Sequence, residues 1–277
     1  MKNRKIWLTI AAFLSVLFLA TGCANQKKDT TKPEKKHTIV MGVTGGQYND
    51  LFDKAVAPIL EKEGYKIKRV NFSQFMLSNT ALGEGNIDVN VAQHTAYMRI
   101  FNRDKKTDLV PLVATPSVPC SLYSSKYYHK SDLKNGMTIG IPQDPSNAAR
   151  AYALLADAGW IKVNKNVKST ELAAKDVTEN PHQLVIKEMD SNTIPHVLAD
   201  LDFEVIPGSV VQSAKIEKKI HLIQQEKLTK DLEIVAAVRK ENENKDWAKA
   251  IKRAYQSKEF KDYMKKHNED HQWVMPK

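Results

Sequence analysis

From residue 38 onward the chain alternates short apolar runs with longer stretches of helical spacing. The short runs, which alternate with polar residues or are rich in β-branched side chains, predict strands. They lie at 38–43, 65–72, 87–91, 109–113, 137–141, 184–189, 201–206 and 233–239. Apolar residues three and four positions apart predict helices at 51–60, 94–101, 145–157, 193–198, 247–255 and 260–266. Repeated strand, helix and strand units predict mostly parallel sheets with helices on both faces.

The strand count suits two sheets better than one, so we expect an α/β protein with two lobes. Lobe 1 is expected to hold 38–118 plus 236–277, because the late strand and the terminal helices can return to the first sheet, and lobe 2 to hold 119–235. Open α/β sheets bind ligands at the carboxyl ends of their strands. The cleft between two such lobes is therefore the expected place for a small ligand.

The chain begins with the pattern of an export signal, which we place at 1–22. Basic residues precede an apolar stretch at 6–20, and small residues then lead to Cys23. The stretch is too short for a transmembrane helix, which needs about 20 apolar residues. It resembles a bacterial lipoprotein signal, which is cleaved before a cysteine that then carries a lipid such as palmitate. We expect lipidation at Cys23, with simple secretion as the alternative.

The net charge of +10 comes from 42 Lys and Arg against 32 Asp and Glu, and it is unevenly distributed. Between residues 38 and 237 there are 23 positive and 23 negative side chains, so the body of the protein is balanced. A nucleic-acid-binding domain carries a clustered basic excess instead. The lysine-rich segment 23–37 reads as a solvated tether. A lipid and a basic tether together hold a protein on an anionic membrane surface, so we expect a membrane partner and no nucleic acid.

No motif for catalysis or cofactor binding occurs in the chain, so we expect no enzyme, no catalytic residue, no cofactor and no metal. His267 and His271 have the i, i+4 spacing of metal ligands. They lie on a lysine-rich terminal segment without an evident third ligand, which leaves a metal-dependent hydrolase as a distant alternative. Cys120 is expected to be a buried small hydrophobic residue and not a reactive thiol.

Two clusters suit ligand recognition. Residues 87–97 end a strand with polar side chains and open a helix carrying His94 and Tyr97, although the same spacing fits an ordinary core stripe. Residues 142–150 place a helix N-terminus one turn before Arg150. Free N–H groups and a guanidinium fork can receive a carboxylate, although an arginine at the edge of a buried stripe can also be merely solvated.

The motifs in and around these clusters give the chain a family resemblance. They are Gly42-Val43-Thr44-x-Gly46, Asn79-Thr80-Ala81-Leu82-x-x-Gly85-x-Ile87-Asp88-x-Asn90-x-x-Gln93-His94 and Pro142-x-Asp144-Pro145-x-Asn147-x-x-Arg150-Ala151. In order and spacing they resemble the methionine-binding lipoproteins of the MetQ type, also called the NlpA family. Members of that family are substrate-binding components of ABC importers.

The resemblance implies a two-lobed, periplasmic-binding-protein-like fold with an amino acid in the cleft. The ligand-binding residues that it implies are Phe75, Asn90, His94, Tyr97, Asn147 and Arg150. Arg150 would pair with the ligand carboxylate with Asn147 near it, the aromatic rings and the histidine would wall an apolar pocket for a thioether, and Asn90 would support that wall. The resemblance also implies ABC permease and ATPase partners for a monomer that is lipid-anchored on the extracytoplasmic face of the cell membrane.

Two of the departures from the family pattern concern the polar backbone of the ligand. Pro207 and Ile234 stand where the family has asparagines for the polar backbone of the ligand. Buried polar groups need partners, so the ligand is expected to be methionine or a methionine-like amino acid, or a short peptide whose amine lies elsewhere. The alternative is an adhesin or signalling lipoprotein that kept the fold and lost the transport ligand.

Overall fold

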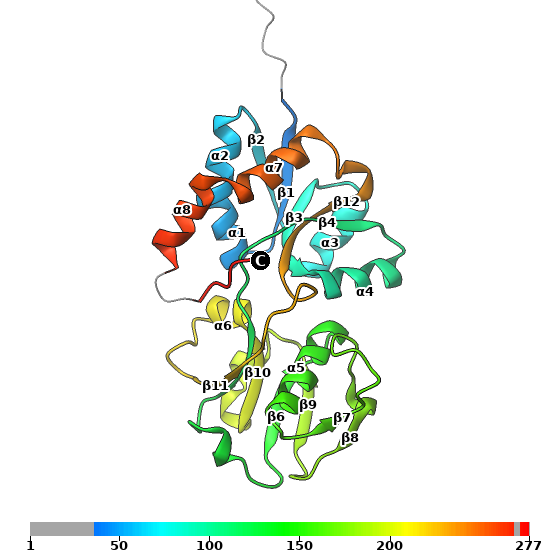
Figure 1. Cartoon of the computed structure of the whole chain (residues 1–277), viewed down its shortest axis with the longest axis vertical. Helices are drawn as coiled ribbons and strands as arrows, with labels where there is room; N and C mark the ends of the chain where they lie inside the picture. The colour runs from blue at the N-terminus through cyan, green and yellow to red at the C-terminus, as the bar shows by residue number, and fades with distance from the viewer. Residues whose placement is uncertain (1–35, 269–271, 277) are drawn as a thin grey trace, which may run out of the picture. The chain divides into compact units, whose positions relative to one another are not determined.

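Two five-stranded sheets, each with helices on both faces, make up most of the protein (Figure 1). The computed structural model describes residues 36–268 and 272–276. The predicted signal peptide, Cys23 and all but the last two residues of the tether lie outside this part of the chain. None of the helices within it is long and apolar enough to cross a bilayer.

The first sheet has the strand order β2-β1-β3-β12-β4. Its strands are β1 (Thr38–Val43), β2 (Lys66–Asn71), β3 (Val89–His94), β4 (Leu109–Ala114) and β12 (Ile234–Arg239). The first four run in one direction and β12 runs against them. Successive strand residues face opposite sides, so Ala236 and Val238 enter one core while Val235 and Ala237 enter another. Both faces of this sheet are therefore buried.

Helices from both ends of the chain cover one face of the first sheet. They are α1 (Gln47–Leu51), the π-helical turn Phe52–Val56, α2 (Ala57–Lys62), α7 (Asp246–Gln256) and α8 (Lys258–His267). The stripe of α7 predicted from the sequence is buried there, including Trp247, Ile251 and Tyr255. The other face carries α3 (Phe75–Gly83) and α4 (Thr95–Lys105).

The second sheet has the order β11-β5-β10-β6-β9. Its strands are β5 (Cys120–Ser124), β6 (Thr138–Pro142), β9 (Val185–Met189), β10 (Phe203–Pro207) and β11 (His221–Gln225). Here β5 runs against the other four. One face packs on α5 (Pro145–Asp157), beside the small hairpin of β7 (Lys162–Val163) and β8 (Val177–Glu179). The other packs on α6 (Gly208–Ala214) and short 3-10 turns.

The chain passes between the sheets through two crossovers, 115–119 and 226–233. At the first sheet they are joined because Thr115 N donates to Ile234 O and Ile234 N donates to Ser117 Oγ, both at 2.8 Å. At the second sheet, Glu226 N donates to Cys120 O at 3.1 Å. The first crossover leads from the first sheet into β5 of the second, and the second crossover leads back into β12 of the first. These are the two strands that run against their sheets.

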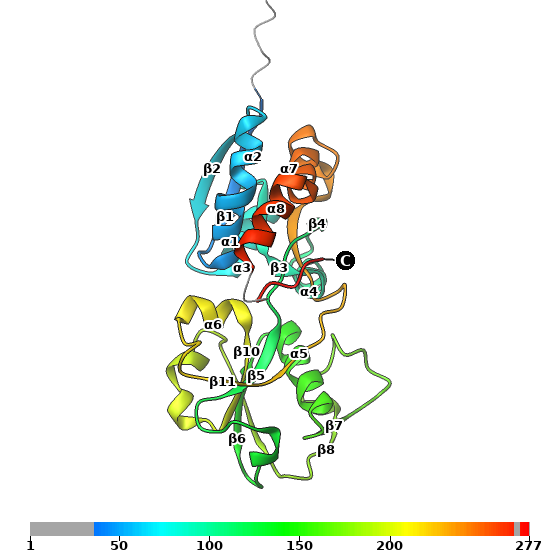
Figure 2. The ribbon, with the colours of Figure 1, turned by 60° about the vertical axis from the view of Figure 1, so that its left-hand side comes forward.

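The last described residues, 272–276, lie beside the first crossover, as Figures 1 and 2 both show. Ser117 and Val274 exchange two backbone hydrogen bonds, with N···O distances of 3.0 and 2.8 Å. The Trp273 ring meets Tyr48 of α1 edge-on with centroids 5.6 Å apart, while Gln212 of α6 donates to Gln272. The end of the chain therefore contacts elements that pack on both sheets.

Each strand predicted from the sequence overlaps an observed strand, and the expectation of two mostly parallel sheets is confirmed. The expected lobe boundary between 235 and 236 falls inside β12, which joins the first sheet from Ile234 onward. The helix predicted at 193–198 is replaced by two 3-10 turns, Ile194–His196 and Leu198–Asp200. The backbone bonds here join residues three apart, from His196 N to Thr193 O and from Val197 N to Ile194 O, and the non-helical backbone of Val197 separates the two turns.

Candidate functional site

Helix α5 begins at the carboxyl end of β6 with a capped first turn. The Asp144 carboxylate accepts from Asn147 N at 3.1 Å, and Pro145 occupies the first helical position, where no N–H is needed. Asn147 and Arg150 are three residues apart, which places them on the same face of the helix. The local sequence thus fixes both side chains at the end of a strand where α/β sheets bind ligands.

Arg150 is held by Glu226 in a buried, two-point ion pair. Its Nε donates to Glu226 Oε2 at 3.0 Å and its Nη2 donates to Oε1, and the two side chains are only 5% and 8% exposed. Glu226 Oε1 also accepts from the backbone N of Cys120 at 2.7 Å. Burial is the largest single influence and lowers the pKa of Arg150, but the Glu226 carboxylate and other neighbouring groups together raise the pKa above its usual value, so the guanidinium keeps its charge.

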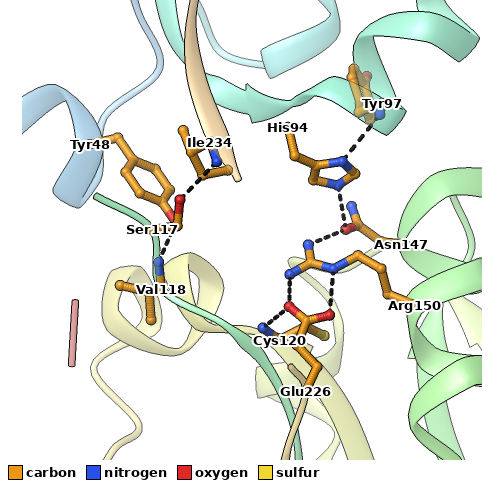
Figure 3. A network of polar contacts seen from close by, with 10 residues as sticks. All are labelled: Tyr48, His94, Tyr97, Ser117, Val118, Cys120, Asn147, Arg150, Glu226 and Ile234. Atoms are coloured by element: carbon orange, nitrogen blue, oxygen red, sulfur yellow. Dashed lines mark hydrogen bonds and ion pairs between the residues drawn. The ribbon is translucent and has the colours of Figure 1, made fainter. Parts of the chain in front are cut away.

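Asn147 joins this pair to His94 of the first sheet. Its Oδ1 accepts from Arg150 Nη1 at 2.8 Å and lies 3.3 Å from His94 Nε2, while its Nδ2 donates to the Asp144 carboxylate. Tyr97 N donates to His94 Nδ1 at 3.2 Å, so Nε2 carries the ring proton and donates to Asn147. A continuous chain of contacts therefore runs from the end of β3 to the crossovers (Figure 3).

His94 is neutral in this environment. Burial and, to a smaller extent, the positive charge of Arg150 together lower the pKa of His94 to about 3. The charged groups of the network are then one guanidinium and the carboxylates of Asp144 and Glu226. The network does not present an isolated positive charge to a ligand.

An aromatic wall adjoins His94. Phe75, the first residue of α3, meets Tyr97 of α4 edge-on with ring centroids 5.4 Å apart, and Tyr97 lies 6.3 Å from the His94 ring in the same edge-on manner. Burial raises the pKa of Tyr97 to about 12, with a further contribution from Asp144. This wall is apolar on its faces and can pack a thioether or another uncharged side chain.

Asn90 lies in a separate cluster of buried amides. Its Oδ1 accepts from Gln93 at 2.9 Å, and it also bonds to Asn79, which in turn donates to Gln93 at 2.9 Å. These bonds tie α3 to β3, the elements that carry Phe75 and His94. The structure therefore brings five of the six predicted residues together, and Asn90 contacts the elements that hold them.

Glu226 is a site residue that the sequence analysis missed. It lies in a polar segment between β11 and β12 that carries no motif, 76 residues after Arg150 in sequence. It directly follows β11, which is not among the strands predicted from the sequence, so no sequence signal pointed to the pairing with Arg150. Tyr48 was also missed: it accepts from Val118 N at 3.1 Å and lies beside the first crossover.

The two departures from the family pattern lie at the crossovers. Pro207 ends β10, and the next residue, Gly208, donates its N–H to Pro119 O at 3.1 Å. Ile234 begins β12 and uses its backbone N–H for Ser117 Oγ. Neither side chain offers a polar group to a ligand.

The remaining candidates from the sequence are structural or fall outside the described residues. Cys120 is a fully buried thiol, and burial raises its pKa to about 12, so it is a buried small residue as predicted. The ring of His267 lies against Tyr263 with centroids 4.2 Å apart, and His271 is not among the described residues. Within 36–268 and 272–276, no three His, Cys, Asp or Glu side chains are grouped to hold a metal ion.

Two α/β lobes, two crossovers and a polar network beside an aromatic wall define a two-lobed substrate-binding protein. A family model described as NlpA lipoprotein matches residues 39–276, and the chain belongs to this family. Outer membrane lipoprotein 1 of Mannheimia haemolytica is 32% identical over 268 residues, which cover 94% of this chain and 95% of that protein. The family consists of substrate-binding proteins and not of enzymes, as the sequence analysis predicted.

Two further relatives are named for methionine. A protein of Pasteurella multocida, named probable D-methionine-binding lipoprotein MetQ, is 30% identical and covers 93% of this chain and 94% of its own length. A nutrient binding protein from Burkholderia cenocepacia, solved bound to methionine, is 30% identical with a TM-score of 0.79. That structure covers 87% of this chain and 100% of its own.

Proposed function

We propose that this protein is the membrane-anchored substrate-binding lipoprotein of an ABC importer and that it captures methionine or a methionine-like amino acid or short peptide between its lobes. The observation that carries the proposal is the network in which His94 of the first lobe meets Asn147 and Arg150 of the second. A ligand held there contacts both lobes at once. Its binding energy can therefore favour the closed arrangement of the two lobes.

The residues around the network suit both ends of such a ligand. In this proposal Arg150 and Asn147 would bind the carboxylate, and Phe75, His94 and Tyr97 would pack the apolar side chain, as their mutual contacts support. The relatives named for methionine support a thioether side chain over other apolar ones.

The protein would be held on the extracytoplasmic face of the cell membrane by a lipid on Cys23. The family is one of lipoproteins, and the segment 1–22 has the pattern of a lipoprotein signal. The partners would be an ABC permease and its ATPase subunits, which receive the ligand after the lobes open. The binding protein itself would act as a monomer by hinge motion at the crossovers 115–119 and 226–233.

Calorimetric titration tests the proposal. The soluble chain from residue 24 onward would be titrated with L-methionine, D-methionine, methionine-containing dipeptides and, as controls, leucine and glutamate. We expect heat and thermal stabilisation with at least one methionine compound and much weaker binding of the controls. No binding of any of these compounds would contradict the proposal.

The alternative, an adhesin or signalling lipoprotein, rests on Pro207 and Ile234. These residues offer no side-chain polar group where the family has asparagines. The same titration separates the two functions, because a protein that kept the fold without the transport ligand would bind no amino acid.

A further inference from the structure

Arg150 has five N–H groups, and within the described part of the chain three of them have acceptors. Two are donated to the Glu226 carboxylate, from Nε and Nη2, and one is donated from Nη1 to Asn147. One N–H remains on each terminal nitrogen. A ligand carboxylate can bind to these two groups only if the plane of the guanidinium stays fixed.

Glu226 is well placed to fix that plane. Its carboxylate is 8% exposed and accepts from three donors, two on Arg150 and the backbone N of Cys120 at 2.7 Å. Its own backbone N donates to Cys120 O at 3.1 Å, so both its main chain and its side chain bind Cys120, where the first crossover enters β5. Glu226 thus joins Arg150 of α5 to the point where both crossovers enter the second lobe.

Glu226 also cancels the charge of Arg150. A buried guanidinium without a partner would attract any carboxylate, whether or not the molecule carried an amine. With Glu226 in place the pair is neutral, while Asp144, the N-cap of α5, adds a negative charge and His94 is uncharged. A zwitterion adds no net charge to this network, whereas a simple anion adds an uncompensated negative charge.

We propose that Glu226 is a positioning and specificity-determining residue. It fixes the guanidinium of Arg150 for the ligand carboxylate, and by cancelling its charge it makes the cleft prefer a zwitterionic amino acid over the matching anion that lacks an amine. This inference rests on the proposed function, because it requires that the cleft binds an amino acid.

The test compares two probes that differ in the amine alone. These are L-methionine and its 2-hydroxy acid analogue, in which a hydroxyl replaces the ammonium group. Dissociation constants for both would be measured by calorimetry with the wild type, E226Q and E226D. The melting temperature of each variant without ligand would report whether it folds.

In the wild type we expect L-methionine to bind more tightly than the hydroxy acid. In E226Q, the ratio of the two dissociation constants is expected to shift toward the anion by about tenfold or more, because the buried guanidinium is no longer neutralised. E226D keeps the negative charge on a shorter side chain. It should therefore bind both probes more weakly while keeping the preference for methionine. If Glu226 had a purely structural role, E226Q would bind both probes more weakly by the same factor.

The outcomes separate this inference from the proposed function. If the wild type binds neither probe, methionine recognition itself fails. If it binds methionine and E226Q leaves the ratio unchanged, Glu226 does not determine specificity. If E226Q does not fold, E226D decides, and wild-type affinities in E226D would contradict the positioning role.

Discussion

Glu204 is a carboxylic acid inside the second lobe, on β10 and away from the ligand-binding network. It is fully buried, and neither carboxyl oxygen has a hydrogen-bond partner among residues 36–268 and 272–276. Burial raises the pKa of Glu204 to about 8, although Lys126 partly opposes the shift. Glu204 is therefore protonated at neutral pH, and its burial lowers the free energy of unfolding by an amount that depends on pH.

This burial predicts a measurable pH dependence of stability. Between about pH 5 and pH 8 the unfolded chain ionises Glu204 while the folded chain keeps it protonated, so the free energy of unfolding falls by up to about 1.4 kcal/mol per pH unit. E204Q removes this loss, and its stability relative to the wild type should rise from pH 5 to pH 8. Urea unfolding at several pH values measures the difference.

Glu217→Gln is the matched control, because Glu217 is exposed in the same lobe. Its stability relative to the wild type should not change with pH. If the difference in stability between E204Q and the wild type were also independent of pH, the buried carboxyl would not be protonated in the folded protein.

Single residues were predictable where they sit next to a structural signal. His94, Asn147 and Arg150 lie just after a predicted strand or at a predicted helix N-terminus, and the family resemblance gave them roles. Glu226 was not predictable, because its partner depends on how the crossovers bring β11 beside β5. Long-range pairing of this kind leaves no periodic pattern in the sequence.

The first turn of α5 is expected to link the stability of the helix to the proposed ligand binding. Asp144 accepts from the backbone N of Asn147, and its two oxygens accept from Asn147 Nδ2 at 3.2 and 3.0 Å. The first bond caps the helix and the others orient the amide, so that Oδ1 points to His94 and Arg150. Removal of this carboxylate should therefore have two separable effects.

We expect D144A to lower the free energy of unfolding by about 1 kcal/mol through loss of the cap. We also expect methionine to bind about tenfold more weakly, because the amide of Asn147 is no longer held in orientation. Ser257→Ala is the matched control, since Ser257 caps α8 by accepting from Phe260 N at 3.1 Å. S257A should lower the free energy of unfolding by a similar amount and leave the affinity for methionine unchanged. If D144A bound methionine as tightly as the wild type does, the Asp144 cap would not contribute to the site.

At the scale of elements, amphipathic helices were predictable and α3 was not. The buried side of α3 includes Ser78 and Asn79 as well as Ala81 and Leu82, so it shows no apolar stripe. Its burial becomes understandable only with β3 in place, because Asn79 bonds to Asn90 and Gln93 there. A polar contact surface between elements is invisible to a hydrophobic pattern.

For the whole molecule, the mostly parallel sheets followed from the repeated strand and helix units, and the single opposed strand in each sheet follows from the crossovers. The contact of residues 272–276 with the first crossover was not predicted, because a short terminal segment has no periodicity to interpret. Together the crossovers and this segment put the proposed hinge beside the proposed ligand-binding network, and Glu226 belongs to both.

A crystal structure of the protein grown with L-methionine tests the central claim most directly. The account predicts density between the lobes, with the ligand carboxylate on the terminal nitrogens of Arg150, the Arg150–Glu226 pair intact, and the thioether against Phe75 and Tyr97. Methionine bound elsewhere, or bound in the cleft without contact to Arg150, would contradict it.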